Sequence, residues 1–288
     1  MGPDGLALLR LLQLADSALP VGAAAHSFGL ESLFEDGLLA ADELERFLRG
    51  YLEESGALEA GFCRAAYQLS QLDGDEFATE WLDLNERLSA RKAPRESREA
   101  SLALGRRFLG LAAELLQGRL SLCPTEQQRR KSDVGRTRSS APDPLVRLPR
   151  PSTSSHVPPA VLPASPLSSG LFCMLTDEAR WTGGLPAGLP AVRLLPSHHV
   201  TAFGLVAAQA GVDERSAVLA WLHQSVTALV SAAQRLAPIG QTRASHILWA
   251  LKPLMADVAQ RPGVDCFTPL PEIASMRHAK LSTRLFIS

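Results

Sequence analysis

Cysteine is scarce and unpatterned in this chain of 288 residues. The cysteines lie far apart, and none forms the C-x-x-C spacing that zinc knuckles and dithiol redox sites use. Dense disulfide frameworks are typical of small secreted domains. The four cysteines are Cys63, Cys123, Cys173 and Cys266. Their scattered positions do not suit a disulfide framework, so the sequence predicts a protein of the reducing cytoplasm.

An excess of charge of either sign is also lacking, because 29 basic and 30 acidic residues give a formal net charge of -1. The whole-chain field therefore offers no attraction for nucleic acid or an anionic membrane. No stretch reaches the roughly 18 uninterrupted apolar residues of a spanning helix. Arg10 and Asp16 interrupt the apolar N-terminal stretch, which argues against a signal peptide. We expect no nucleic-acid partner and no membrane partner.

The common catalytic signatures are missing as well. A P-loop needs a lysine directly after a glycine, and no lysine in this chain follows a glycine. The chain also lacks the G-x-S-x-G, H-E-x-x-H and G-x-G-x-x-G motifs of hydrolases, zincins and dinucleotide enzymes. We predict that the protein is not an enzyme and carries no cofactor.

Helical periodicity is abundant. Apolar residues recur at steps of three and four, and no segment alternates as a half-buried strand does. Asp213 is placed to cap one helix, Gly211 to end the helix before it, and Asp42 to cap another. Pro253 should kink or break the last long helix. The pattern predicts an all-α bundle, with periodic segments at 42–52, 77–88, 104–115, 218–233 and 242–258.

One long segment, Gly118–Pro196, differs in kind, because it holds 12 of the 20 prolines together with many serines and arginines. Such a composition does not readily form a packed core. We interpret it as a low-complexity, disordered linker or insertion. Residues 1–117 and 197–288 are then two halves of a single helical domain.

A pair of histidines and a cluster of arginines could belong to a binding site, but each has a simpler structural explanation. His198 and His199 could ligate nickel or zinc, but adjacent helical residues point in different directions and no cysteine or carboxylate lies beside them. A helix-end role is favoured, and no metal site is predicted. The arginines around Arg95 alternate with Glu96 and Glu99 as an exposed helix face would, which suits solubility or an acidic protein partner.

Two stretches near the chain ends are less ordinary. Ala15–Gly22 runs into His26–Glu31, which mixes a Pro-Gly turn with polar groups that a simple helix junction does not need. Ile273–His278 leads to an apolar and basic terminus, Arg284–Ser288. Leu, Phe, Met and Arg suit a docking tail. The alternatives are a helix, a turn and a capped helix at the first stretch, and a last helix packed on its own bundle at the second.

These stretches resemble the UreF family, whose members carry LADSALPVG, HSFGLE, SMRH and RLF. Here the motifs stand at Leu14–Gly22, His26–Glu31, Ser275–His278 and Arg284–Phe286. The resemblance extends to Ala202–Gly204 and Pro238–Gln241. In all it covers residues 5–117 and 198–288.

The resemblance implies an all-helical homodimer that acts with the urease accessory proteins UreD (also called UreH) and the GTPase UreG to deliver nickel to apo-urease. UreG would carry the GTP chemistry. The partner-binding residues implied are Ser275, Met276, Arg277, His278, Arg284, Leu285 and Phe286. The motif turn comprises Asp16, Pro20, Gly22, His26, Ser27, Phe28, Gly29 and Glu31.

The chain departs from the family in three places. Ala23–Ala25 replace an aromatic residue, Ala279 and Ser282 replace acidic and aromatic residues, and Gly118–Pro196 stands where a short helical stretch is usual.

Two other functions remain as alternatives to the one that the resemblance implies. One is a helical enzyme that uses Asp16 or Glu31 with His26 as acid and base. The other is an all-α interaction module unrelated to urease.

Overall fold

The computed structural model of the chain describes residues 5–22, 26–72, 74–116, 192, 195–262 and 268–287. Every regular element in these ranges is a helix, so the all-α prediction is confirmed. The predicted linker, residues 118–196, lies outside the described residues except for 192, 195 and 196, and so do Ala23–Ala25.

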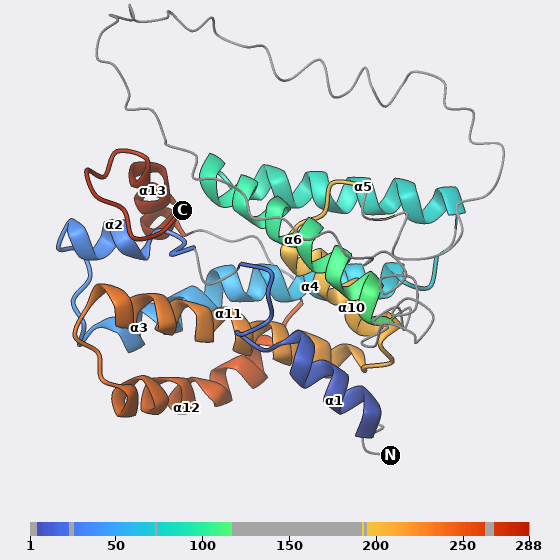
Figure 1. The fold of residues 1–288 in the computed structure, drawn as a ribbon, viewed down its shortest axis with the longest axis horizontal. Helices are drawn as coiled ribbons and strands as arrows, with labels where there is room; N and C mark the ends of the chain where they lie inside the picture. The colour runs from blue at the N-terminus through green and yellow to red at the C-terminus, as the bar shows by residue number, and fades with distance from the viewer. Residues whose placement is uncertain are drawn as a thin grey trace, which may run out of the picture. The chain divides into compact units, whose positions relative to one another are not determined.

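The described residues of the N-terminal half form seven helical elements (Figure 1). α3, a π-helical turn η2 and α4 follow one another without a break. The elements are α1 (Gly5–Leu14), α2 (Leu30–Glu35), α3 (Leu44–Tyr51), η2 (Leu52–Gly56), α4 (Ala57–Leu69), α5 (Gly74–Arg91) and α6 (Arg95–Leu116). After residue 196 the described helices are α10 (His199–Gln209), α11 (Glu214–Leu236), α12 (Gln241–Val258) and α13 (Pro269–His278).

α10 lies at the centre of the core. It packs against α4 and α6 from the first half of the chain and against α11 from the second, and every residue from His199 to Ala207 is buried. Two glycines permit this packing, because a Cβ at Gly204 would clash with the carbonyl of Cys63 and one at Gly105 with the carbonyl of Ser197. Helices from both sides of the undescribed segment therefore share one hydrophobic core.

The helix ends follow the sequence in part. Asp213 caps α11 by accepting a hydrogen bond from the Ser216 amide at 2.9 Å, and Gly211 adopts a φ of 79° just after α10, as predicted. The cap predicted at Asp42 is wrong, because Glu43 precedes the first residue of α3 and makes no side-chain cap. α12 also runs through Pro253 unbroken. Pro253 is exposed, so the carbonyl that its missing N–H leaves unbonded can reach water.

One described helix, Glu214–Leu236, is long and apolar enough to cross a membrane by length and composition alone. Half of the most apolar 18-residue stretch of this helix is buried inside the protein. Trp221, Val226 and Val230 lie in the core. A core helix of a globular domain passes the same test.

Candidate partner-binding site

The two unusual stretches of the sequence meet in the structure. α13 packs against α2, and Figure 1 shows the red C-terminal helix beside the blue α2. Gly29, which precedes α2, has a φ of 90°. A Cβ there would lie 2.7 Å from the carbonyl oxygen of Pro271 and 3.1 Å from the amide nitrogen of Ser275. Glycine is therefore required both by the backbone conformation and by the close approach of α13.

A buried network joins these helices to α6. Nε2 of His278 lies 2.8 Å from Oε2 of Glu31, and Nδ1 of His278 lies 2.9 Å from Oε2 of Glu96. The His278 side chain is completely buried, and that of Glu31 is 6% exposed. Buried polar groups are costly unless they are hydrogen-bonded, so these contacts fix the position of α13 on the bundle.

The C-terminal tail is tied to the same carboxylate. The amide of Leu285 donates to Oε1 of Glu31 at 2.5 Å, and the amide of Phe286 donates to Oε2 at 3.3 Å. The Phe286 side chain is buried, and the Arg235 guanidinium lies 5.7 Å from the centre of its ring. Chain ends usually fray. Here the bonds to Glu31 and the burial of Phe286 hold this part of the tail against the bundle.

Two arginines of the predicted site lie at the edge of this network. Arg277 forms an ion pair with Asp36 at 3.0 Å. Arg284 donates to the carbonyl of Ala279 and lies 3.8 Å from a carboxylate oxygen of Glu96. Both side chains are well exposed, so these ion pairs contribute little stability and leave the guanidinium groups accessible.

The predicted partner-binding residues thus divide into two groups. Ser275, His278 and Phe286 are buried within the chain's own fold, whereas Met276 and Leu285 are exposed. Further exposed apolar residues lie on α13 and the tail and were not in the predicted set. We call the exposed apolar residues of α13 and the tail the docking stripe, which comprises Leu270, Ile273 and Met276 on α13 and Leu285 and Ile287 on the tail.

The first part of the N-terminal motif makes contacts that stabilise the fold. Asp16 accepts a hydrogen bond from the Ala18 amide at 2.8 Å and thereby closes a turn. The guanidinium of Arg107 bonds the carbonyl of Val21 at 3.2 Å, next to Gly22, whose φ is 83°. Pro20, in the same turn, is exposed. The turn is therefore fastened to α6.

The second part of the motif is largely inside the protein. His26 and Ser27 are buried, and Phe28, with a φ of 51°, is partly buried, with its ring centre 5.9 Å from that of His26. Burial, together with the nearby positive charge of Arg107, lowers the pKa of His26 below its usual value. The carboxylate oxygens of Glu31 bond His278 and the tail.

His198 and His199 have different environments, as expected for adjacent residues at a helix start. The ring nitrogens of His198 lie 2.8 Å from Oγ of Ser89 and 3.0 Å from Oγ of Ser101. Its amide donates to Asn85 at 2.9 Å. Burial, followed by the charges of Lys92 and Arg98, lowers the pKa of His198 to about 3. His198 is thus a neutral structural residue whose ring nitrogens are engaged by hydroxyl groups.

His199 packs among aromatic rings. Its ring centre lies 5.4 Å from that of Phe108 and 5.0 Å from that of Trp221, both in edge-on geometry. Burial, followed by the charges of His26 and Lys92, lowers its pKa to about 4, so the ring is neutral at pH 7. Among the described residues, no three His, Cys, Asp or Glu side chains gather as a metal site requires.

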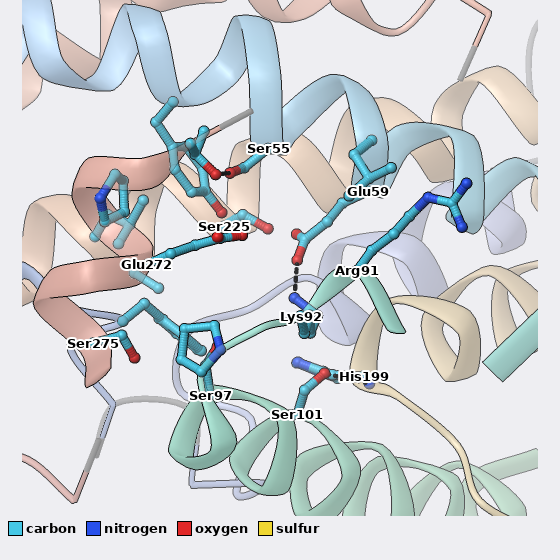
Figure 2. Close-up of a pocket in the computed structure, with 18 of the residues that line it drawn as sticks. Ser55, Glu59, Arg91, Lys92, Ser97, Ser101, His199, Ser225, Glu272 and Ser275 are labelled. Atoms are coloured by element: carbon cyan, nitrogen blue, oxygen red, sulfur yellow. Dashed lines mark hydrogen bonds and ion pairs between the residues drawn. The ribbon is translucent and has the colours of Figure 1, made fainter. Parts of the chain in front are cut away.

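His199 also borders a cavity of about 130 Å³. Figure 2 shows Glu59 and Lys92 pointing toward one another across it, with Ser101 beside His199. Nζ of Lys92 lies 2.8 Å from Oε1 of Glu59, whose other oxygen accepts from the indole of Trp221 at 3.2 Å. A second cavity of about 150 Å³, beside Asp16 and Arg235, shares three lining residues with the first: His199, Gln224 and Ala228.

Fold and site together define an all-helical scaffold whose C-terminal helix and tail present exposed apolar side chains. The family model of UreF matches residues 39–252, and the chain belongs to the UreF family of urease accessory proteins. Proteins named urease accessory protein UreF match nearly all of it. The one from Nostoc sp. is 27% identical over 97% of this chain and 95% of its own length.

Two further relatives carry the same name. The protein from Lachnoclostridium phytofermentans is 27% identical over 98% of both chains, and the one from Synechocystis sp. is 30% identical over 99% of both chains. The family resemblance and the prediction of a non-enzymatic protein are therefore confirmed. The alternatives of a helical enzyme and of a module unrelated to urease are set aside.

Proposed function

We propose that this chain is a non-catalytic assembly factor that acts in the insertion of nickel into apo-urease, as a cytoplasmic homodimer that joins UreD (UreH) to the GTPase UreG. The chain has no P-loop lysine, so GTP hydrolysis falls to UreG. The docking stripe binds UreD, and UreG occupies a different face.

The observation that carries the proposal is the exposure of the docking stripe. Leu285 is 73% exposed, Ile287 69%, Ile273 53% and Met276 49%. Leu270, Ile273 and Met276 follow at steps of three on α13, so they share one side of that helix. Adjacent exposed apolar side chains mark protein-binding surfaces.

The buried network supports this surface from behind. Glu31 holds His278 and both tail amides, so the exposed side chains of α13 and the tail are presented by a fixed backbone. A preorganised surface binds more tightly, because less conformational entropy is lost on association. Arg277 and Arg284 supply a polar, cationic rim to the stripe.

The test is co-purification of the full chain with UreD and UreG from the same source. Met276→Asp places a charge in the docking stripe and should weaken UreD capture at least about tenfold. Trp249→Asp is the matched control, because Trp249 is an exposed apolar residue on a different helix, α12. Undiminished capture by Met276→Asp, in a chain shown to be folded by circular dichroism, would contradict the assignment of the stripe.

A second measurement tests the biological role. The gene for this chain should restore urease activity to a strain that lacks its own UreF, and the Met276→Asp variant should restore much less. Restoration by the variant at the level of the unsubstituted chain would separate urease maturation from the docking stripe. Failure of the folded, unsubstituted chain in a strain that supplies its own UreD and UreG would count against the proposed function.

A further inference from the structure

The cavity beside His199 has both apolar and polar walls. Its volume is about 130 Å³, and residues of α4, α6, α11 and α13 line it. Leu58, Leu104 and Trp221 belong to the apolar part of the wall. One water molecule needs much less space than this, and an apolar cavity of about 150 Å³ can bind benzene. The space therefore fits a compact organic molecule of about four or five heavy atoms.

Two buried polar atoms of the lining have no partner. Nε2 of His199 and Oγ of Ser275 are buried and form no hydrogen bond with any described residue. Both residues line the cavity, and Figure 2 shows them on different sides of it, with His199 next to Ser101. Buried polar atoms are nearly always hydrogen-bonded, so an orphaned one calls for an explanation. A molecule that occupies the cavity and forms hydrogen bonds would supply it.

The ionised side chains around the cavity balance one another. Two are acidic, Glu59 and Glu272, and two are basic, Arg91 and Lys92. Lys92 and Glu59 form an ion pair at 2.8 Å. His199 adds no charge at pH 7, because burial lowers its pKa to about 4. A charged ligand would give up its hydration without a net opposite charge in the cavity to compensate it. The lining therefore favours an uncharged molecule.

Lys92 and His199 offer complementary hydrogen-bonding groups. Among the described residues, Nζ of Lys92 bonds Glu59 alone, whereas the two oxygens of Glu59 are engaged by Lys92 and Trp221. An ammonium group has three donors, so Lys92 can also donate to an oxygen of a ligand. A neutral imidazole has one nitrogen that accepts. A carboxamide carries a carbonyl oxygen and an N–H group side by side, which matches this pair.

We propose that the cavity is a binding site for a small, uncharged molecule with an amide group. Its carbonyl oxygen accepts a hydrogen bond from Nζ of Lys92, and its N–H group donates to Nε2 of His199. Leu58 and Leu104 contact its hydrocarbon part. This site belongs to the chain itself, so the inference does not rest on the proposed function.

The test uses acetamide as the probe and the full, unsubstituted chain. Because acetamide has only four heavy atoms, we expect a dissociation constant on the order of 1 mM. In an NMR titration the nitrogen resonance of Nε2 of His199 should shift. The ring nitrogens of His198 are already engaged by Ser89 and Ser101 and should shift much less. Acetate has the same shape but a negative charge, and it should bind at least about tenfold more weakly.

A pair of variants locates the probe. Ala228 on α11 lines the cavity, so Ala228→Leu fills space there and leaves Lys92 and His199 in place. This variant should weaken acetamide binding at least about tenfold, because a packed interior does not hold two groups in one space. Ala220→Leu is the matched control, because Ala220 is a half-buried residue of α11 that lines neither of the two cavities described above. It should bind acetamide as the unsubstituted chain does.

Three results would overturn the inference. Acetamide that shows no saturable binding far above the expected dissociation constant would mean that the cavity holds water only. Equal binding by Ala228→Leu and the unsubstituted chain would place acetamide elsewhere. Acetate that binds as tightly as acetamide would contradict the choice of an uncharged ligand. If Ala228→Leu fails to fold, the unsubstituted chain decides the location, because bound acetamide that leaves Nε2 of His199 unshifted contradicts the proposed contact.

Discussion

The carboxylate of Glu31 bonds the imidazole of His278 at 2.8 Å, although 247 positions separate the two residues. The same carboxylate accepts the amides of Leu285 and Phe286. One buried side chain near the N-terminus therefore holds the last helix and the tail. Three groups depend on its negative charge.

The substitution Glu31→Gln tests this dependence. A glutamine side chain would keep the size of the original one but lose the charge and place an NH2 group where donors now converge. We expect the free energy of unfolding to fall by about 2 to 4 kcal/mol, because hydrogen bonds to a buried charged group are lost. Hydrogen exchange at Leu285 and Phe286 should accelerate.

Glu35→Gln is the control, because Glu35 lies exposed on the same helix. Its unfolding free energy should change by less than about 0.5 kcal/mol. If Glu31→Gln is as stable as Glu35→Gln and its tail amides stay protected, Glu31 does not hold the tail.

Gly29 offers a test of the contact between α2 and α13. Alanine at this position is strained by the φ of 90° and meets the backbone of Pro271. Gly37→Ala is matched, because Gly37 also has a positive φ, of 67°, but has open space around its Cβ position. We expect Gly37→Ala to cost about 1 kcal/mol and Gly29→Ala clearly more, about 2 to 4 kcal/mol in denaturant unfolding. Equal losses of unfolding free energy in the two variants would show that α13 shifts easily to make room for the added methyl group.

The sequence predicted much of the fold because periodicity is a local signal. The stripe that includes Val218, Trp221 and Val226 predicted α11 and its buried side, and Asp213 predicted its cap. The helix does not end at Pro253, because a proline on the exposed side of a helix is tolerated.

The site was less predictable, because its contacts are long-range. The motifs marked Glu31 and His278 as unusual, but no local pattern pairs groups so far apart. Glu96 looked like one charge of an exposed, alternating helix face, and its contact with His278 depends on where α13 packs. The three-residue spacing places Ile273 on the same side of α13 as Met276. Ile273 was not predicted as a docking residue, because the sequence does not show which side of α13 is exposed.

Gly204 should be hard to replace, because it lies where two core helices cross. A Cβ there would clash with the Cys63 carbonyl, where α10 crosses α4, and neither backbone can shift without disturbing the centre of the bundle. We expect Gly204→Ala to lower the unfolding free energy by about 2 kcal/mol or more. Gly50→Ala, in α3 with open space around it, should instead raise it by about 0.5 to 1 kcal/mol. A stable Gly204→Ala variant would contradict the close packing of these helices.

The buried histidines His198 and His199 make stability depend on pH. Their pKa values in the folded protein are about 3 and about 4, against an ordinary 6.5. Below pH 6.5 the unfolded chain therefore takes up protons that the folded chain refuses, and stability falls as the pH falls toward 4. Each residue contributes up to about 1.4 kcal/mol per pH unit.

The substitution His199→Phe tests this dependence. It keeps an aromatic ring beside Phe108 and Trp221 but removes one titrating group. The free energy of unfolding, measured in urea, should therefore depend less steeply on pH between 6.5 and 4. The exposed His246→Phe leaves both buried imidazoles in place and should keep the slope of the unsubstituted chain. An unchanged slope in His199→Phe would mean that His199 is charged in the folded protein, contrary to its burial among aromatic rings.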